Sequence, residues 1–223
     1  MITHPFPLLR QFDDLINVSM LTKKDAVRTD EEIGNVLQSD HMASLWQMHG
    51  NRTIVVRNAT SRTEQADGIA TDVRGLTLTI RWADCQNFLI LEPEKKIICL
   101  VHAGWRGMKA KALTSAFKTL KREWGIDPKN IWVGAGPSLC RNCAEFSNPK
   151  NELPDFSAFT KGNCIDLQVA ADAELQTLGV RPERIDRSPD CTKCHRELYW
   201  TYRGGDREKV KEGWSNGLAV TLK

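Results

Sequence analysis

The chain has 223 residues, of which 41% are hydrophobic, and this length suffices for the core of one ordinary domain, which we expect to span residues 1–223. The formal net charge is only +3, and Lys and Arg are interleaved with Asp and Glu, which argues against nucleic acid as a partner. The N-terminus lacks the basic start and apolar run of a signal peptide, and no stretch reaches membrane-spanning length, so we expect a cytoplasmic protein.

The first forty residues show weak hydrophobic periodicity and are assigned only loosely, with a charged loop and at most a short helix expected over 21–40. From Ser44 onward the pattern becomes clearer. Runs rich in β-branched and aromatic residues alternate with turn-rich segments and predict strands of one sheet system at 53–57, 76–82, 88–91 and 97–102.

The second half mixes helices and strands. Apolar residues at helical spacing predict one helix over 113–125, with a lysine-rich outer face, and another over 167–178 that begins at a capping residue, Asp166. A short strand is expected at 131–134, and short strands and loops over 185–222. No glycine-rich phosphate loop follows the first strand, so the chain predicts an α/β (α+β) sandwich of mixed β-sheets with flanking helices and no nucleotide-binding Rossmann or P-loop fold.

Three segments place a metal-binding side chain beside a glycine or at a strand end. They are QMHGNR around His49, WADCQN around Cys85 and VHAGWRG around His102. Two imidazoles and one thiolate suit zinc, and three protein ligands leave a fourth position for water or substrate, as in catalytic sites. Copper is compatible with the same ligands.

The residues around these ligands also indicate a binding site. Gly50, Gly104 and Gly107 stand where the backbone must turn tightly or approach a ligand closely. Arg106 lies two residues past a glycine and offers a fixed fork of donors for phosphate or carboxylate.

These residues belong to a set of joined motifs, namely QMHG (47–50), ADGIAT (66–71), LTLTIRWADC (76–85), HAGWRG (102–107), VGAGPSLCRNCAEF (133–146) and CTKCHRELYWTYR (191–203). In these motifs the chain resembles, from about Leu45 to Arg203, the bacterial laccase-like multicopper polyphenol oxidase family, whose members look like zinc-dependent purine nucleoside phosphorylases with adenosine deaminase activity. Residues 1–43 match this family only weakly.

The resemblance implies that His49, Cys85 and His102 bind the metal. It also implies two reactions on purine nucleosides. The first is the phosphorolysis of adenosine, inosine and methylthioadenosine to a free base and a ribose 1-phosphate, and the second is the hydrolytic deamination of adenosine to inosine. Small-molecule nucleosides and phosphate are therefore the expected partners.

Further roles follow from what these reactions need. Arg106 is the first candidate for phosphate binding, and Arg203 is the second. Asp84 can orient or deprotonate the attacking water, or it can serve as a capping residue. Gln47 can hold the base or sugar by hydrogen bonds, or it can bond to the end of a strand.

Three alternatives remain open at this point. Cys85 can act as a thiolate nucleophile with His102 as its base, as in a cysteine hydrolase or deamidase. A copper-dependent phenol oxidase is the second alternative, although the five histidines are too few for a multicopper centre. In a non-enzyme binding module, the two CxxC pairs at 140–143 and 191–194 can close a structural zinc site of Cys140, Cys143, Cys191 and Cys194. CTKCH also matches a haem-attachment pattern, but the expected cytoplasmic α/β context argues against covalent haem.

Overall fold

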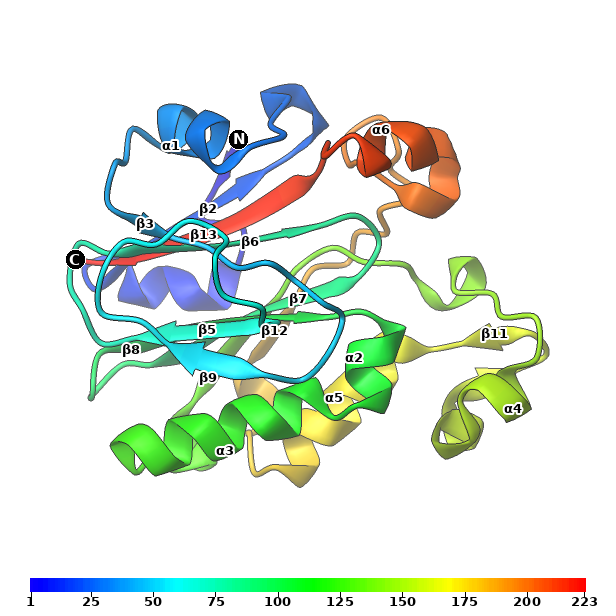
Figure 1. Cartoon of the computed structure of the whole chain (residues 1–223). Helices are drawn as coiled ribbons and strands as arrows, with labels where there is room; N and C mark the ends of the chain where they lie inside the picture. The colour runs from blue at the N-terminus through cyan, green and yellow to red at the C-terminus, as the bar shows by residue number, and fades with distance from the viewer.

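Two β-sheets stacked face to face form the centre of the computed structural model, which describes residues 1–223 (Figure 1). The first sheet has the strand order β1-β2-β13-β6-β3, and the second has the order β12-β9-β7-β8-β5-β4. Parallel pairs join β3 to β6, β4 to β5 and β12 to β9, while the other neighbours are antiparallel. The predicted sandwich of mixed sheets is therefore confirmed.

The strands of the first sheet are β1 (Ile2–Thr3), β2 (Ile16–Leu21), β3 (Met42–Ala43), β6 (Thr77–Trp82) and β13 (Asn216–Leu222). Those of the second sheet are β4 (Thr53–Val55), β5 (Gly68–Thr71), β7 (Gln86–Glu92), β8 (Ile97–Ala103), β9 (Trp132–Ala135) and β12 (Ile185–Arg187). A separate ribbon consists of β10 (Thr160–Lys161) and β11 (Cys164–Ile165).

The helices flank this sandwich. They are α1 (Asp30–Leu37), α2 (Trp105–Lys109), α3 (Ala112–Trp124), α4 (Pro149–Glu152), α5 (Leu167–Thr177) and α6 (Arg207–Lys211). Figure 1 shows α1 on the outer side of the first sheet and α3 and α5 on the outer side of the second. Single helical turns include η4 (Arg141–Cys143) and the π-turn η7 (Tyr202–Asp206).

Strand β7 explains how the layers are held together. Leu89 and Leu91 pack in the core between the two sheets, whereas Phe88 and Ile90 pack in the core between the second sheet and its helices. All four side chains are at most 1% exposed. Because both faces of β7 are buried here, the four residues from Phe88 to Leu91 form a continuous apolar run with no alternation.

The predicted helix ends agree with the structure. Helix α3 ends at Gly125, which adopts the left-handed conformation (φ 61°) and donates its N–H to the carbonyl of Lys121. Asp166 accepts a hydrogen bond of 3.1 Å from the N–H of Val169 and caps α5. Both capping predictions are confirmed.

The two ends of the chain differ from the prediction. Strand β2, for which the sequence predicts no definite element, pairs with β13 from Leu21 opposite Gly217 to Ile16 opposite Leu222. Its side chains are buried at every position except Asn17, so it lacks the alternation of a half-buried strand, and its partner lies at the other end of the chain. The expected short helix is α1, whereas the long strand β13 and the helix α6 replace some of the short strands and loops expected over 185–222.

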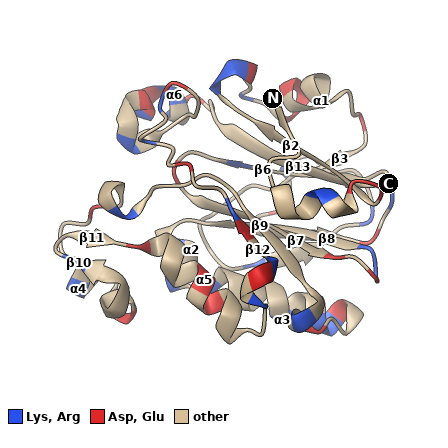
Figure 2. Cartoon of the chain, turned by 180° about the vertical axis from the view of Figure 1, so that it is seen from behind, with Lys and Arg blue, Asp and Glu red and all other residues tan.

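Charged residues are distributed over the surface. Figure 2 shows Lys and Arg interspersed with Asp and Glu on the helices and loops, as the sequence indicates. None of the helices combines the length and the apolar character that a membrane crossing requires.

Candidate metal centre

The register of two adjacent strands brings the first two candidate ligands together. Gln86, the first residue of β7, pairs with Ala103, the last residue of β8. Cys85 precedes Gln86 and His102 precedes Ala103, so both lie at the same edge of the second sheet. His49 reaches this edge from the loop before β4, and its ring meets that of His102 edge to face, with centroids 4.9 Å apart.

The three ligand atoms of His49, Cys85 and His102 all lie within 4.8 Å of one another. Cys85 is half-buried, His102 is buried and His49 is exposed, so the group is open to solvent on the side of His49. The two imidazoles and the thiol therefore form a donor set that can hold a metal ion.

Asp67, which precedes β5, organises this group. Its buried carboxylate accepts hydrogen bonds from the backbone N–H groups of Met48 (3.2 Å), His49 (2.9 Å) and Gly50 (2.7 Å). The same carboxylate lies 2.9 Å from Nδ1 of His102. Since Nδ1 is engaged there, Nε2 of His102 is the nitrogen left for a metal, which is the usual arrangement of a carboxylate behind a histidine ligand.

The sequence interpretation assigned no role to Asp67, although a signal was present. Asp67 stands directly before the apolar strand of the ADGIAT motif and is only 1% exposed. A carboxylate at such a place needs partners that compensate its burial. The partners themselves lie in separate segments, and only the fold identifies them.

Cys85 and His102 form a coupled pair of ionisable groups. Burial opposes ionisation of the thiol, but the adjacent rings of His102 and His49 outweigh it and lower the pKa of Cys85 to about 6. Burial also opposes protonation of His102, yet the Cys85 thiolate and Asp67 raise the pKa of His102 to about 9. Because metal binding requires a thiolate and a neutral imidazole, a bound cation would replace the proton on His102.

Backbone conformation at the site is unusual in two places. His49 has φ 61° and Asp84 has φ 78°, a left-handed region that side chains rarely adopt and that is found at functional sites. The sequence interpretation gave Gly50 as a place of tight turning or close approach to a ligand, and the residue with the left-handed conformation is its neighbour His49. Gly104 has a different role, because a Cβ there would lie 2.5 Å from Sγ of Cys85.

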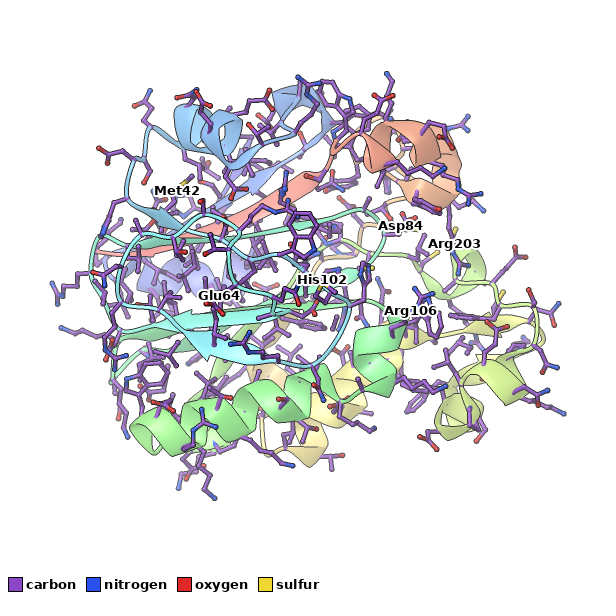
Figure 3. The ribbon with its side chains drawn as sticks, in the orientation of Figure 1. Met42, Glu64, Asp84, His102, Arg106 and Arg203 are labelled. Carbon is purple, nitrogen blue, oxygen red and sulfur yellow. The ribbon has the colours of Figure 1, made fainter.

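A cavity of about 510 Å³ opens in front of the three ligands, a volume within the usual range for small-molecule sites. Its wall includes several apolar and aromatic side chains, among them Trp105, Leu139, Phe146, Leu167 and Tyr202. In Figure 3, Asp84, Arg106 and Arg203 lie at one end of the molecule, and His102 lies farther toward the centre. All four of these labelled residues line the cavity.

Arg106 and Arg203 reach the cavity from different elements. Arg106 in α2 stacks on Trp105, with 4.4 Å from Cζ to the ring centroid, and Arg203 in η7 stacks on Phe146 at 5.3 Å. The two aromatic rings meet edge to face with centroids 6.1 Å apart. Arg203 also donates to the carbonyl of Glu145. Neither guanidinium pairs with a carboxylate, so both can take an anion.

The carboxylate of Asp84 is engaged on both oxygens. Oδ1 accepts from the hydroxyls of Thr192 (2.7 Å) and Thr201 (2.6 Å), and Oδ2 accepts from the backbone N–H of Arg203 (2.7 Å). These contacts fasten the segment 191–203 to the turn that carries Cys85. They favour the capping role of Asp84 over the deprotonation of water.

Gln47 lies outside the cavity lining. Its side-chain amide donates to the carbonyl of Arg81 (2.7 Å) and accepts from the N–H of Arg81 (2.9 Å). The amide therefore extends the pairing at the end of β6. This geometry supports the second role predicted for Gln47, a hydrogen bond to the end of a strand. It does not support the first, a contact with the base or sugar.

The fold and the site define an α/β protein in which two histidines and a cysteine that can hold a metal ion line a cavity. A family model described as multi-copper polyphenol oxidoreductase laccase matches residues 16–219, and the chain belongs to this family. The match begins well before Leu45, so it includes a large part of the N-terminal segment that the motifs left unmatched.

Relatives in this family carry enzyme names. The purine nucleoside phosphorylase LACC1 of Mus musculus is 28% identical over 198 residues, which cover 82% of this chain and 41% of the relative. The protein of the same name from Homo sapiens is 30% identical and covers 69% of this chain and 37% of the relative. The chain thus spans less than half the length of these two proteins. The adenosine deaminase RL5 from an unknown prokaryotic organism is 25% identical over 63% of this chain and 57% of its own.

Solved structures confirm the fold. The hypothetical protein YfiH of Bacillus licheniformis superimposes with a TM-score of 0.84 over 98% of this chain and 99% of its own, at 20% identity. YlmD of Geobacillus stearothermophilus superimposes with a TM-score of 0.77 over 93% of this chain and 92% of its own, at 19% identity.

The histidines of the chain do not form a multicopper centre. Only His49 and His102 belong to a cluster of metal-binding side chains. His4 and His195 instead lie beside carboxylates, and His41 lies beside a backbone carbonyl. The number and placement of these residues argue against the multicopper chemistry in the family description.

Proposed function

We propose that this chain is a zinc-dependent purine nucleoside phosphorylase that acts on adenosine, inosine and methylthioadenosine. The observation that carries the proposal is that one cavity combines the His49–Cys85–His102 donor set with two arginines that lack carboxylate partners. Relatives named purine nucleoside phosphorylase support the substrate class. The family match over residues 16–219 supports a single domain.

The donor set fits zinc. His49, Cys85 and His102 would hold the ion, and Asp67 would keep the ring of His102 in the orientation that presents Nε2. A metal held by these residues would supply a Lewis acid to a substrate in the cavity. Copper can occupy the same ligands, so metal analysis belongs to the test.

In phosphorolysis, an oxygen of hydrogen phosphate forms a bond to C1′ of the ribose while the bond from C1′ to the purine nitrogen breaks, and its electron pair leaves with the base. The proton that the phosphate gives up ends on the base. Arg106 and Arg203 would bind the phosphate by charge-assisted hydrogen bonds. Stacking on Trp105 and Phe146 restricts both guanidinium groups before the anion arrives, which lowers the entropy lost on binding. The apolar wall of the cavity would take the purine ring.

The assay for this proposal uses purified, metal-loaded protein with adenosine and inorganic phosphate. Adenine and ribose 1-phosphate should form, and Cys85→Ala should lose both the metal of this site and the turnover. Arg106→Ala should raise the KM for phosphate about tenfold or more, since a charge-assisted hydrogen bond contributes roughly 1.5–3 kcal/mol, and it should affect the KM for adenosine less. Adenosine left intact by metal-loaded protein would refute the proposal.

Adenosine deaminase activity is the second candidate. It is supported by the relative named adenosine deaminase RL5 and needs only water, the metal centre and a cavity for the purine. The same protein without phosphate should convert adenosine to inosine and ammonia. Absence of both products removes this activity and leaves phosphorolysis to be judged by its own assay.

The cysteine hydrolase alternative uses the same side chains without a metal. The lowered pKa of Cys85 beside His102 is compatible with a thiolate nucleophile. If turnover persists after the metal is removed and disappears when Cys85 is then alkylated, this alternative replaces the phosphorylase. If removal of the metal alone abolishes turnover, and zinc restores it, the metal-dependent reaction holds.

We place the enzyme in the cytoplasm. All seven cysteines are unpaired in the structure, which is usual in a reducing compartment. Nucleosides and phosphate are the partners that this proposal requires. The charged surface, where basic and acidic residues are mixed, does not favour nucleic acid (Figure 2).

A further inference from the structure

A second group of metal-binding side chains lies beside the cavity. The Sγ atoms of Cys140, Cys143, Cys191 and Cys194 are all within 4.8 Å of one another. Cys140 precedes the turn η4 and Cys143 is its last residue, and the other two lie in the segment before α6. In Figure 1 the orange chain that precedes α6 runs beside the lime-green chain that follows β9, and a bridge from Ser138 to Cys191 joins them.

The spacing of the sulfur atoms matches a tetrahedral metal site. Zinc–sulfur bonds of about 2.3 Å place the sulfurs of a tetrahedron about 3.8 Å apart, and Sγ of Cys143 lies 3.7 Å from Sγ of Cys194. A disulfide requires about 2.05 Å, so these two thiols are not bonded to each other.

The backbone is folded as such a site requires. In both CxxC segments the chain turns back on itself, since the N–H of Cys143 donates to the carbonyl of Cys140 (2.9 Å) and the N–H of His195 donates to the carbonyl of Cys191 (2.9 Å). The N–H of Cys140 also donates to Sγ of Cys191 at 3.2 Å. Such a bond stabilises a thiolate, and it runs from one CxxC segment to the other.

The surrounding charges fit four thiolates. A divalent cation with four thiolates carries two excess negative charges. Arg141 and Lys193 lie inside the two CxxC segments, and Arg196 follows the second. Asp190 directly precedes the second segment, where it accepts a hydrogen bond from Tyr199, and Glu145 follows the first, so the cations that can offset the negative charge from inside the segments are Arg141 and Lys193.

The cluster is connected to the catalytic cavity. Cys191 precedes Thr192, whose hydroxyl donates to Asp84, and Asp84 also holds the backbone of Arg203. On the other side, Ser138 and Leu139 line the cavity just before Cys140. A crosslink at the four cysteines therefore ties together two segments that both contribute to the cavity wall.

We propose that Cys140, Cys143, Cys191 and Cys194 bind a structural zinc ion that is separate from the catalytic centre and that holds the Arg203 segment against the segment after β9. Four thiolates in a closed site leave no position for substrate, so this ion stabilises and does not take part in the reaction. The site is independent of the proposed phosphorylase activity, and its metal content can be measured without turnover.

Metal analysis of four proteins tests the site. The wild type should contain two zinc ions per chain, Cys194→Ser one and Cys85→Ser one. The matched control Cys164→Ser changes a half-buried thiol outside both clusters and should keep two. Because Cys194 is exposed, its substitution is the one that disturbs packing least. A wild type with one zinc that is lost only in Cys85→Ser would overturn the proposal, as would intact-protein masses that show disulfides among the four cysteines.

Cobalt substitution provides a second readout that depends on the ligands. In the Cys85→Ser background, cobalt should give the intense thiolate charge-transfer absorption of a tetrahedral four-sulfur site, and adding Cys143→Ser should weaken it strongly. Absence of this absorption in the Cys85→Ser protein would contradict four-cysteine coordination, whether or not the protein has enzyme activity.

The stabilising role has its own test. Cys194→Ser should retain the catalytic zinc but show faster amide hydrogen exchange over residues 191–203 and a higher KM for phosphate, because Arg203 is less restrained. Exchange over these residues that equals that of Cys164→Ser would overturn the assigned role, even if zinc binds.

Discussion

Cys85 has two imidazole rings as neighbours and ionises under their influence. Asp67 orients one of these rings through Nδ1 and fixes the loop of the other through backbone N–H groups. A single buried carboxylate thus positions both histidines. At the scale of residues, the site depends on Asp67 as much as on its three ligands.

The ionisation of Cys85 leads to a prediction for the metal-free protein. Because its pKa is lowered to about 6, the thiol is mostly ionised at neutral pH, so its alkylation rate should rise through about pH 6 and then level off. An ordinary thiol levels off above about pH 8.5. Iodoacetamide labelling read by peptide mass spectrometry measures the profile. Cys99, buried and with a raised pKa, should stay unlabelled, and zinc should protect Cys85. A midpoint near 8.5 would contradict the interaction of Cys85 with the histidines.

The first residues of helix α2 contact the candidate metal ligands, and this contact limits the size of the side chain that the N-cap of the helix can have. Gly104 is its N-cap and lies against the side chains of Cys85 and His49. Gly107 lies one turn later, where a Cβ would be 3.2 Å from the carbonyl of Gly50. The two glycines of HAGWRG therefore allow the helix to approach the ligands closely.

Gly104→Ala should weaken zinc binding about ten- to a hundredfold, the range seen when the surroundings of metal ligands are disturbed, because the added Cβ would displace Cys85. Gly50→Ala is the matched control, since a Cβ there makes only an ordinary contact of 3.5 Å with Asp67. Zinc affinity measured by competition with a chromophoric chelator separates the two. Equal affinities would show that α2 can move away from the ligands.

The sandwich as a whole positions the centre through its second sheet. Adjacent ends of β7 and β8 carry two ligands, and Asp67 precedes β5, which pairs with β8 on its other side. Asp84 fastens the segment 191–203 beside this edge through its bonds to Thr192, Thr201 and Arg203. The cavity therefore forms only when distant parts of the chain have folded together.

Asp84→Asn tests this long-range link. Asparagine tolerates the left-handed backbone of Asp84 but cannot accept from both threonine hydroxyls and from the N–H of Arg203. Loss of one buried acceptor should cost about 1–3 kcal/mol, measured as a lower urea midpoint. The KM for phosphate should rise more than that for adenosine. An unchanged midpoint together with unchanged kinetics would show that other contacts hold Arg203 in place.

Much of the fold could be predicted from local patterns. The strands β4 and β6 to β8, the two main helices and their caps follow from periodicity and from Gly125 and Asp166, because these signals act within a few residues. Strand β2 could not be recognised, since nearly all its side chains are buried and β13 lies at the opposite end of the chain. The interpretation of the chain as one domain stays a prediction.

The sequence by itself determined the chemical nature of the site: which residues can bind a metal, that Arg106 and Arg203 can bind an anion, and which family the motifs resemble. Only the tertiary structure decided the partners of these residues. In the structure Asp67 lies behind His102, and Gln47 lies outside the cavity lining. Asp84 accepts hydrogen bonds from the C-terminal segment, and the two CxxC segments lie side by side. The physical reason is that motifs encode local chemistry, whereas these contacts depend on strand register and on packing between segments far apart in the chain.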